Sequence, residues 1–342
     1  MITLFLSSVA AAAQQSHAVI LQYHHVSEDT PSSTSVSPER FAEHLAYISE
    51  HYTVLPLEKI INALQKHESV PENSIAITFD DGYRNILENA HPLLKHHGFA
   101  YTIFVNPALQ GTRSNLLTWE ELKLISQEGA SIANHYLGHE HLLYKEKGKT
   151  DARWLKDHES NILLAEEIIE SYIGTSPRYF AYPYGEYNTQ IQALLRKHNI
   201  QGFAQHSGAI SADSDFTALP RFPASGVYSN LNTLKVKMAS LAFPVIKNSV
   251  TEPQLDASGK LENFTLKVDL SDIYASQVAC YYKGNPQVLT WQENQVDIGI
   301  PEHFPTGRSR INCTAPSKSK LGHYYWFSQP FFVPTESGDW LN

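Results

Sequence analysis

Two neighbouring carboxylates, Asp80 and Asp81, stand at the end of a short apolar run, Ile75 to Phe79, and are followed by Gly82. The run is rich in β-branched residues, which predicts a buried strand, and a helix is expected from Asn85 to His97. Adjacent carboxylates repel each other, so a fold that keeps both indicates a use for them. We expect a division of labour in which a cation holds one carboxylate and the other stays free to act as a base.

Two histidines further along the chain, His135 and His139, supply imidazoles four positions apart. This spacing predicts that both rings lie on one side of a helical turn and reach a common metal. One carboxylate and two imidazoles leave coordination positions open for water and substrate, which is the arrangement of a hydrolytic zinc site. Taken singly, Asp81 could instead cap the following helix, and the histidines could be surface residues in a chain that contains 17.

Three motifs, in this order, resemble those of the NodB-homology polysaccharide deacetylases, which form carbohydrate esterase family four. They are Thr78-Phe79-Asp80-Asp81-Gly82, the His135-x-x-x-His139 pair and Tyr182-Pro183-Tyr184-Gly185. The likeness extends over residues 18–243, and the segment Tyr23-His24-His25 is similar to the start of the poly-N-acetylglucosamine deacetylases. The resemblance implies a hydrolase that removes N-acetyl groups from a polysaccharide with the help of a metal.

The resemblance also implies roles for these residues. Asp81, His135 and His139 are expected to bind a divalent metal, with zinc as the default and cobalt, nickel or iron also suited to the donor set. Asp80 is then the general base toward the attacking water. The backbone N–H of Tyr184 is expected to stabilise the oxyanion, although an ordinary turn is the alternative for its motif.

Two positions differ from the family pattern around the base and the metal. Tyr136 stands where serine or threonine is usual, and Ala181 stands where an arginine normally orients the base. Arg221, at the expected end of a later strand, could reach the same carboxylate, or it could be a solvated charge beside Pro220. We therefore include Arg221 among the candidate catalytic residues.

A third difference concerns the group that protonates the departing amine. The family often ends with a Leu-x-His motif, and the chain has no histidine between His206 and His303. His206 and His24 are the candidate replacements, with His24 and Tyr184 also expected to contact the substrate.

Alternating strand and helix patterns predict a parallel sheet, here an incomplete or distorted (β/α) barrel. Strands are expected at 18–23, 75–79, 100–105, 129–133, 178–182, 202–206 and 218–221. Helices are expected from Ser37 and at 57–67, 118–128, 152–172, 188–198 and 232–241. In such barrels the chemistry lies at the C-terminal ends of the strands, and the candidate residues fall at or just beyond those ends.

The pattern changes after residue 254 to short alternating segments separated by turn residues, which predicts a small C-terminal β-sandwich. We therefore expect a deacetylase domain at 14–245, a linker from Pro244 to Pro253 and an accessory domain at 254–342. Cys280 and Cys313 lie in strand-like segments of this domain. In an exported protein they are expected to pair, stabilising the domain by roughly 3 kcal/mol, whereas a cytosolic location would leave two free thiols.

Residues 1–13 are apolar and end in small residues, which predicts a secretory signal peptide, although no lysine or arginine precedes the apolar run. An N-terminal extension is the alternative. The predicted signal peptide makes a periplasmic or extracellular location the expected one, and no run is long enough to span a bilayer. The net charge of -9 and the absence of a basic stripe disfavour nucleic acid and strongly anionic polymers as partners.

The expected substrate is poly-N-acetylglucosamine of an exopolysaccharide, on the strength of the resemblance. Peptidoglycan or chitin oligomers, O-acetylated xylan-like sugars, and a catalytically silent polysaccharide-binding role remain alternatives. The β-sandwich would position the catalytic domain on the polymer or on a partner in the cell envelope.

Overall fold

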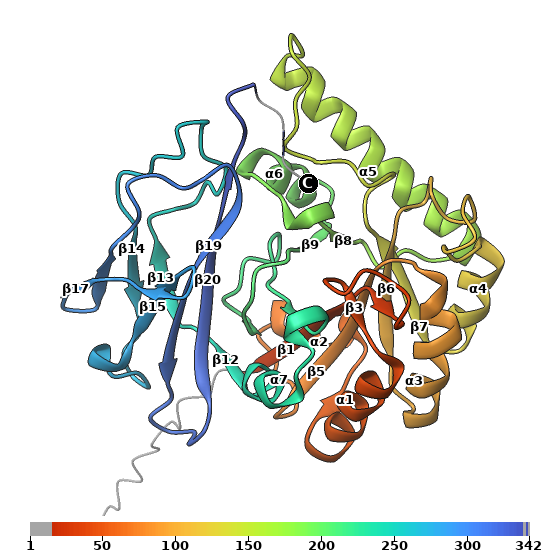
Figure 1. Ribbon diagram of the computed structural model, residues 1–342, viewed down its shortest axis with the longest axis horizontal. Coiled ribbons are helices and arrows are strands. Elements are labelled where there is room, and N and C mark those ends of the chain that lie inside the picture. Colours follow the sequence, from red (N-terminus) through yellow and green to blue (C-terminus); the bar gives the residue numbers. More distant parts are fainter. Residues whose placement is uncertain (1–15, 338–339, 341–342) are drawn as a thin grey trace, which may run out of the picture.

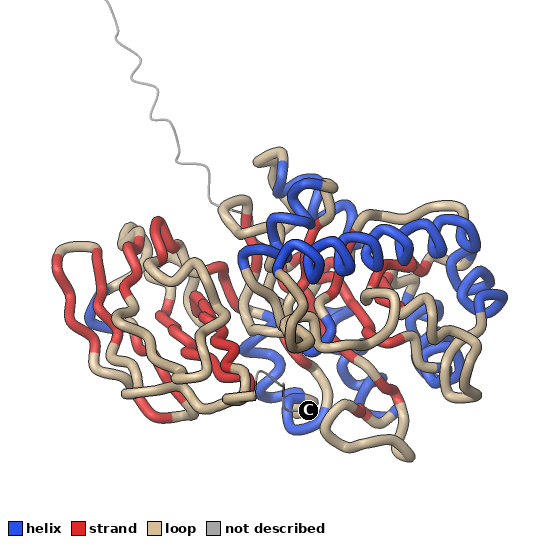
Figure 2. The backbone as a smooth tube through the Cα atoms, turned by 90° about the horizontal axis from the view of Figure 1, so that it is seen from above, coloured by secondary structure: helices blue, strands red, loops and turns tan. Residues whose placement is uncertain are grey.

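The computed structural model describes residues 16–337 and Trp340, so the predicted signal peptide lies outside the described residues. The chain forms a larger part of mixed helices and strands and a smaller part made of strands, lying side by side (Figures 1 and 2).

The larger part is organised around a curled sheet of nine strands. Its main path runs β10 (Ile210–Ser211), β1 (His17–Tyr23), β5 (Ser74–Asp81), β6 (Tyr101–Val105), β7 (Ala130–Asn134), β8 (Tyr179–Ala181) and β9 (Gln201–Phe203). Off this path, β4 (Thr53–Val54) pairs with β5 and β11 (Phe222–Pro223) pairs with β1. Every pairing is parallel except that of β10 with β1. The parallel strands are buried on both faces, as their continuous apolar runs predict.

Helices cover this sheet and complete the predicted distorted (β/α) barrel, which is confirmed as a half-barrel (Figure 1). They are α1 (Pro38–His51), α2 (Leu57–Gln65), α3 (His91–His97), α4 (Trp119–Gln127), α5 (Asp151–Ile173), α6 (Thr189–Lys197) and α7 (Leu231–Met238). The predicted helix starts at Ser37 and Thr118 are confirmed as N-caps, and Glu121 completes a capping box at the second. A π-helical turn, η1 (Ile86–Ala90), precedes α3.

The expected strand at 218–221 is wrong. Leu219 makes one isolated bridge to Phe203, and the next strand is β11, which begins after Arg221. Pro220 has no N–H to continue a ladder, and this interruption is the physical reason for the difference.

The smaller part consists of two sheets with a hydrophobic core between them, which agrees with the predicted β-sandwich. One sheet has the order β12 (Ser240–Ala242), β20 (Tyr324–Val333), β19 (Gly307–Pro316), β15 (Ala279–Tyr282) and β16 (Asn285–Pro286). The other has the order β13 (Val245–Asn248), β14 (Thr265–Val268), β18 (Gln295–Ile298) and β17 (Leu289–Gln292). Cys280 and Cys313 lie opposite each other on β15 and β19 and form a disulfide.

The two parts are in direct contact. Strand β12, within the range expected for the deacetylase domain, pairs in parallel with β20, and the segment expected as a linker contains β13. The Phe222 and Trp326 rings meet edge to face with centroids 5.4 Å apart. The division of the chain at residues 245 and 254 stays a prediction. Within the described residues, no helix has both the length and the apolar character needed to cross a membrane.

Candidate active site

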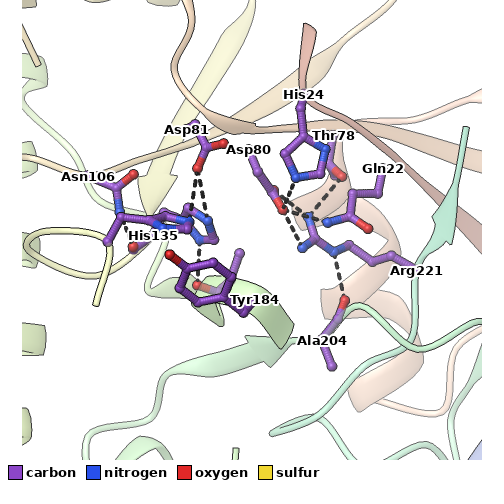
Figure 3. Close-up of polar contacts among 12 residues, drawn as sticks. Gln22, His24, Thr78, Asp80, Asp81, Asn106, His135, Tyr184, Ala204 and Arg221 are labelled. Carbon is purple, nitrogen blue, oxygen red and sulfur yellow. Dashed lines mark hydrogen bonds and ion pairs between the residues drawn. The ribbon is translucent and has the colours of Figure 1, made fainter. Parts of the chain in front are cut away.

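Asp81, His135 and His139 converge at the C-terminal edge of the sheet. Figure 3 shows Asp81 beside His135. Asp81 ends β5, and His135 directly follows β7. The Nε2 atoms of His135 and His139 each lie 3.3 Å from Asp81 Oδ1. One donor atom from each residue lies within 4.8 Å of the others.

The donor set fits a divalent metal. His135 Nδ1 lies 2.8 Å from the carbonyl oxygen of Ala181, which can only accept a hydrogen bond. The ring proton therefore belongs on Nδ1, and the lone pair of Nε2 faces Asp81. Asp81 Oδ1 and His135 Nε2 are buried and have no hydrogen-bond partner among the described residues. A metal ion coordinated by these two atoms would supply the partner that each of them lacks.

A loop, not the predicted helical turn, brings the two histidines together. The backbone of Tyr136 is left-handed, with φ of 71°, which breaks any helix after His135. The Asn106 side-chain amide donates to the carbonyl oxygens of His135 and, at 2.6 Å, of Gly138. Asn106 thus fixes both ends of the turn that carries the ligands.

Tyr136, which stands where the family pattern has serine or threonine, supports the loop from His135 to His139 through its own contacts. Its buried ring points away from the carboxylates toward α5, where the hydroxyl lies 2.8 Å from His158 Nδ1 and accepts from Asn161 Nδ2 at 2.9 Å. Its backbone N–H donates to Asn134 Oδ1 at 2.7 Å. The unusual residue therefore ties the histidine loop to a long helix.

Asp80 lies on the opposite side of the strand end and is held by Arg221 (Figure 3). The Nη1 and Nη2 atoms of Arg221 donate to Oδ1 and Oδ2 of Asp80 at 2.7 and 2.8 Å. Both side chains are fully buried, so Arg221 is not a solvated charge. Gln22 Nε2 donates to Oδ2 at 2.7 Å, and His24 Nε2 lies 3.9 Å from the same oxygen.

The charges around the carboxylates keep both ionised. Burial by itself would raise the pKa of Asp80, but the charges of Arg221 and His135 outweigh it and lower the pKa to about 2. Burial opposes ionisation of Asp81 as well, and the close approach of His135 together with the other nearby histidines brings its pKa below the ordinary range. Burial, followed by the neighbouring His135, lowers the pKa of His139 to about 4, which leaves a neutral ring able to act as a ligand.

Tyr184 lies beside the histidine loop in a short 3-10 turn, η2 (Pro183–Gly185), that follows β8. Its backbone is left-handed, with φ of 57°. The Tyr184 ring stacks on His141 at 3.9 Å and meets His139 edge to face at 4.5 Å. From the C-terminal part, Arg308 Nη1 donates to the Tyr184 carbonyl oxygen at 3.0 Å. The unusual backbone conformation is therefore held from two sides.

The structure does not bring His206 into this cluster. Its ring lies beside Tyr187, with centroids 6.2 Å apart, and its charged neighbours are Arg310 and Asp215. His24, by contrast, follows β1 and is partly exposed next to Asp80. Of the two histidines considered for protonating the amine, only His24 lies beside the carboxylates.

Four further residues support the site and were not identified from the sequence: Gln22, Asn106, Glu186 and Arg308. Gln22 and Asn106 had a signal, since each is a polar residue at the end of an apolar strand. Glu186 is fully buried and lies 2.9 Å from His141 Nδ1 and 4.0 Å from Arg308 Nε. Arg308 had no local signal, because it meets Tyr184 across 124 positions of sequence.

A half-barrel with an Asp-His-His cluster and a second, arginine-held aspartate at its strand ends defines a hydrolase site of the carbohydrate esterase class. Residues 67–203 match the family model described as polysaccharide deacetylase. This region of the chain belongs to that family, and the protein is an enzyme of the hydrolase class.

Proteins of known sequence and structure agree with this assignment. The candidate polysaccharide deacetylase YxkH of Bacillus subtilis is 28% identical over 208 residues, which cover 60% of this chain and 71% of that protein. The poly-beta-1,6-N-acetyl-D-glucosamine N-deacetylase of Staphylococcus epidermidis is 25% identical over 236 residues, covering 62% and 80%. The structure of the Streptococcus pyogenes deacetylase PplD in complex with acetate covers 66% of this chain and 99% of its own, with 22% identity and a TM-score of 0.59, and supports the fold.

Proposed function

We propose that this protein removes N-acetyl groups from an N-acetylglucosamine polysaccharide, with poly-N-acetylglucosamine as the favoured substrate. The observation that carries the proposal is the Asp81, His135 and His139 cluster beside an ionised Asp80 held by Arg221. The preference for poly-N-acetylglucosamine rests on the similarity to the Staphylococcus epidermidis enzyme.

Asp81, His135 and His139 would hold the divalent metal, with zinc favoured by one carboxylate and two imidazoles. Such an ion polarises a carbonyl group and lowers the pKa of water toward neutrality. Because His135 Nδ1 faces the Ala181 carbonyl, the ring is oriented with Nε2 toward the ligand cluster before a metal binds.

Asp80 acts as the general base in this proposal. It takes a proton from the water that adds to the acetyl carbonyl carbon, and its two hydrogen bonds from Arg221 keep it ionised and oriented. The backbone N–H of Tyr184 donates to the oxyanion that forms. The C–N bond then breaks and acetate leaves. The departing amine takes a proton, and His24, whose Nε2 lies 3.9 Å from Asp80 Oδ2, is the candidate donor.

An exported location forms part of the proposal. The Cys280–Cys313 disulfide is consistent with an oxidising compartment. Arg308 of the C-terminal sheets contacts the turn η2 (Pro183–Gly185) that carries Tyr184, which we call the catalytic loop. These sheets would hold the polymer or a cell-envelope partner.

Acetate release from zinc-loaded protein and acetylated β-1,6-linked glucosamine oligomers tests this function. Asp80→Asn should lower release by roughly 10²–10⁴-fold while retaining zinc, because only the base is lost. Asp297→Asn, at an exposed position on β18, is the matched control and should leave release unchanged. Zinc binding without release from any acetylated glycan would instead favour a polysaccharide-binding protein. Faster release from acetylated xylan than from the amide substrates would indicate an esterase.

A further inference from the structure

A groove of about 580 Å³ lies between the catalytic loop and the C-terminal part of the chain. It begins at Tyr184, which contacts His139, and continues along β19. Strands β19 and β20 face the edge of the half-barrel that carries β8 and β9 (Figure 1). Its volume falls within the range of sites that take small organic ligands.

The catalytic loop and β19 form the groove as one connected surface. Arg308 donates to the Tyr184 carbonyl oxygen at 3.0 Å, and its guanidinium carbon lies 5.3 Å from the centre of the Tyr184 ring. Arg310 Nη2 donates to the Tyr228 hydroxyl at 3.3 Å. Tyr228 is partly exposed at this edge, and because the Lys237 ammonium lies over one face of its ring at 4.3 Å, the opposite face is the one that could meet a sugar ring.

Two residues that line the groove each carry a polar side-chain atom without a hydrogen-bond partner among the described residues. His206 Nδ1 and Ser309 Oγ are buried and have no partner among the described residues, and both residues line the groove. Burial, and then the charge of Arg310, lower the pKa of His206 to about 3, so the ring is neutral at physiological pH. A neutral imidazole and a hydroxyl can pair with the hydroxyl and amide groups of a sugar.

The groove is also positively charged, in contrast to the net charge of -9 of the whole chain. Lys283, Arg308 and Arg310 line it, and none of its described lining residues is an aspartate or a glutamate. Glu186 contacts Arg308 from beneath Tyr184 and does not line the groove. A cationic group entering this space would meet like charges, whereas a neutral amide would not.

We propose that this groove binds a neighbouring sugar of the same glycan chain in its N-acetylated form and disfavours a sugar that is already deacetylated. The proposal rests on the proposed function, which produces a protonated amine from each neutral acetamide. An enzyme with this second subsite leaves acetylated sugars between the ones it deacetylates.

Binding to the inactive Asp80→Asn protein tests the groove without turnover. The probes are a fully acetylated β-1,6-linked glucosamine tetramer and the fully deacetylated tetramer, compared at pH 6, where the free amines are protonated. We expect the acetylated tetramer to bind at least tenfold more tightly. Adding Arg310→Gln should reduce the ratio of the two affinities, acetylated over deacetylated, at least threefold. Lys283→Gln should do the same, and because Lys283 is exposed, a loss of folding would not explain its effect.

Arg153→Gln, which removes an exposed arginine on α5, is the matched control and should keep the ratio. A ratio unchanged in both groove variants, or no binding of either tetramer, overturns the proposal. The two proposals fail separately. If the wild-type protein releases acetate but Arg310→Gln does not change the affinity ratio, the proposed function stands and the proposed subsite is rejected. If Arg310→Gln changes the affinity ratio but the wild-type protein releases no acetate, the subsite stands and the proposed function is rejected.

Discussion

Arg221 contacts Asp80 across 141 positions of sequence and makes a two-pronged hydrogen bond with it. Ala181 occupies the position at which the family pattern places the arginine. Arg221 is fixed independently of Asp80, because its Nε donates to the Ala204 carbonyl oxygen at 3.0 Å. The same contact with the carboxylate is therefore made from another segment of the chain, and the Ala204 carbonyl oxygen helps to orient the guanidinium independently of Asp80.

Arg221→Ala tests this interpretation at the level of one residue. It leaves the buried Asp80 without its cation, and we expect a loss of about 3–5 kcal/mol in the free energy of unfolding. Urea unfolding of the purified protein measures this loss.

Arg221→Lys separates charge from geometry in the same experiment. It keeps the charge but not the paired hydrogen bonds, so it should recover part of the stability while acetate release stays at least roughly tenfold below the wild type. Equal acetate release by the lysine variant and the wild type would contradict the claim that the paired geometry matters.

At the scale of elements, the loop from His135 to His139 shows what sequence reasoning can and cannot provide. The strand before it and the candidate ligands were identified, because apolar β-branched runs and metal-binding side chains are local signals. The shape of the loop was not, because it depends on the left-handed Tyr136 and on Asn106, which comes from the end of β6. A four-residue spacing fits a helix and a tight loop equally well.

Asn106→Ala should weaken zinc binding by roughly 10–100-fold, because the carbonyl oxygens of His135 and Gly138 lose their common donor. Competition with a chromogenic chelator measures the affinity directly, with no need for turnover. Asn115→Ala, in the exposed loop that precedes α4, serves as the control and should bind zinc as the wild type does. If Asn106→Ala retained wild-type affinity, the loop would be held by other contacts.

The same limit explains the other differences at this scale. The strand predicted at 218–221 fails because Pro220 interrupts the ladder, yet Arg221 still faces the site. In the C-terminal part, where short segments were expected, β20 runs without interruption from Tyr324 to Val333. Pro330 is accommodated within β20, whose neighbour β19 continues past it. Local patterns thus located most elements, whereas the ends and continuity of strands depended on neighbours distant in sequence.

In the whole molecule, the C-terminal sheets contact the half-barrel at several points, one of them beside the candidate site. Their contact with the half-barrel includes the β12–β20 pairing and the Phe222–Trp326 ring pair. A further contact joins Glu252 to the start of α6, where the Thr189 backbone N–H donates to a carboxylate oxygen at 3.1 Å. These contacts fix the position of β19, and β19 places Arg308 on the catalytic loop.

Arg308→Gln tests whether this connection reaches the chemistry. Tyr184 has a left-handed backbone, and its carbonyl oxygen would lose the donor that helps to hold it. We expect kcat for acetate release to fall roughly tenfold with a smaller change in KM, because the misplaced group is the proposed oxyanion donor and not a ground-state contact.

Arg308→Lys should recover part of that kcat, since it can still donate to the Tyr184 carbonyl oxygen, and Arg153→Gln should show no change. A purely structural role would lower the melting temperature of both Arg308 variants and leave kcat per folded molecule intact. A rise in KM alone would place Arg308 in polymer binding only. A fall in kcat that lysine partly reverses is expected only if the C-terminal sheet acts on the reaction through Tyr184.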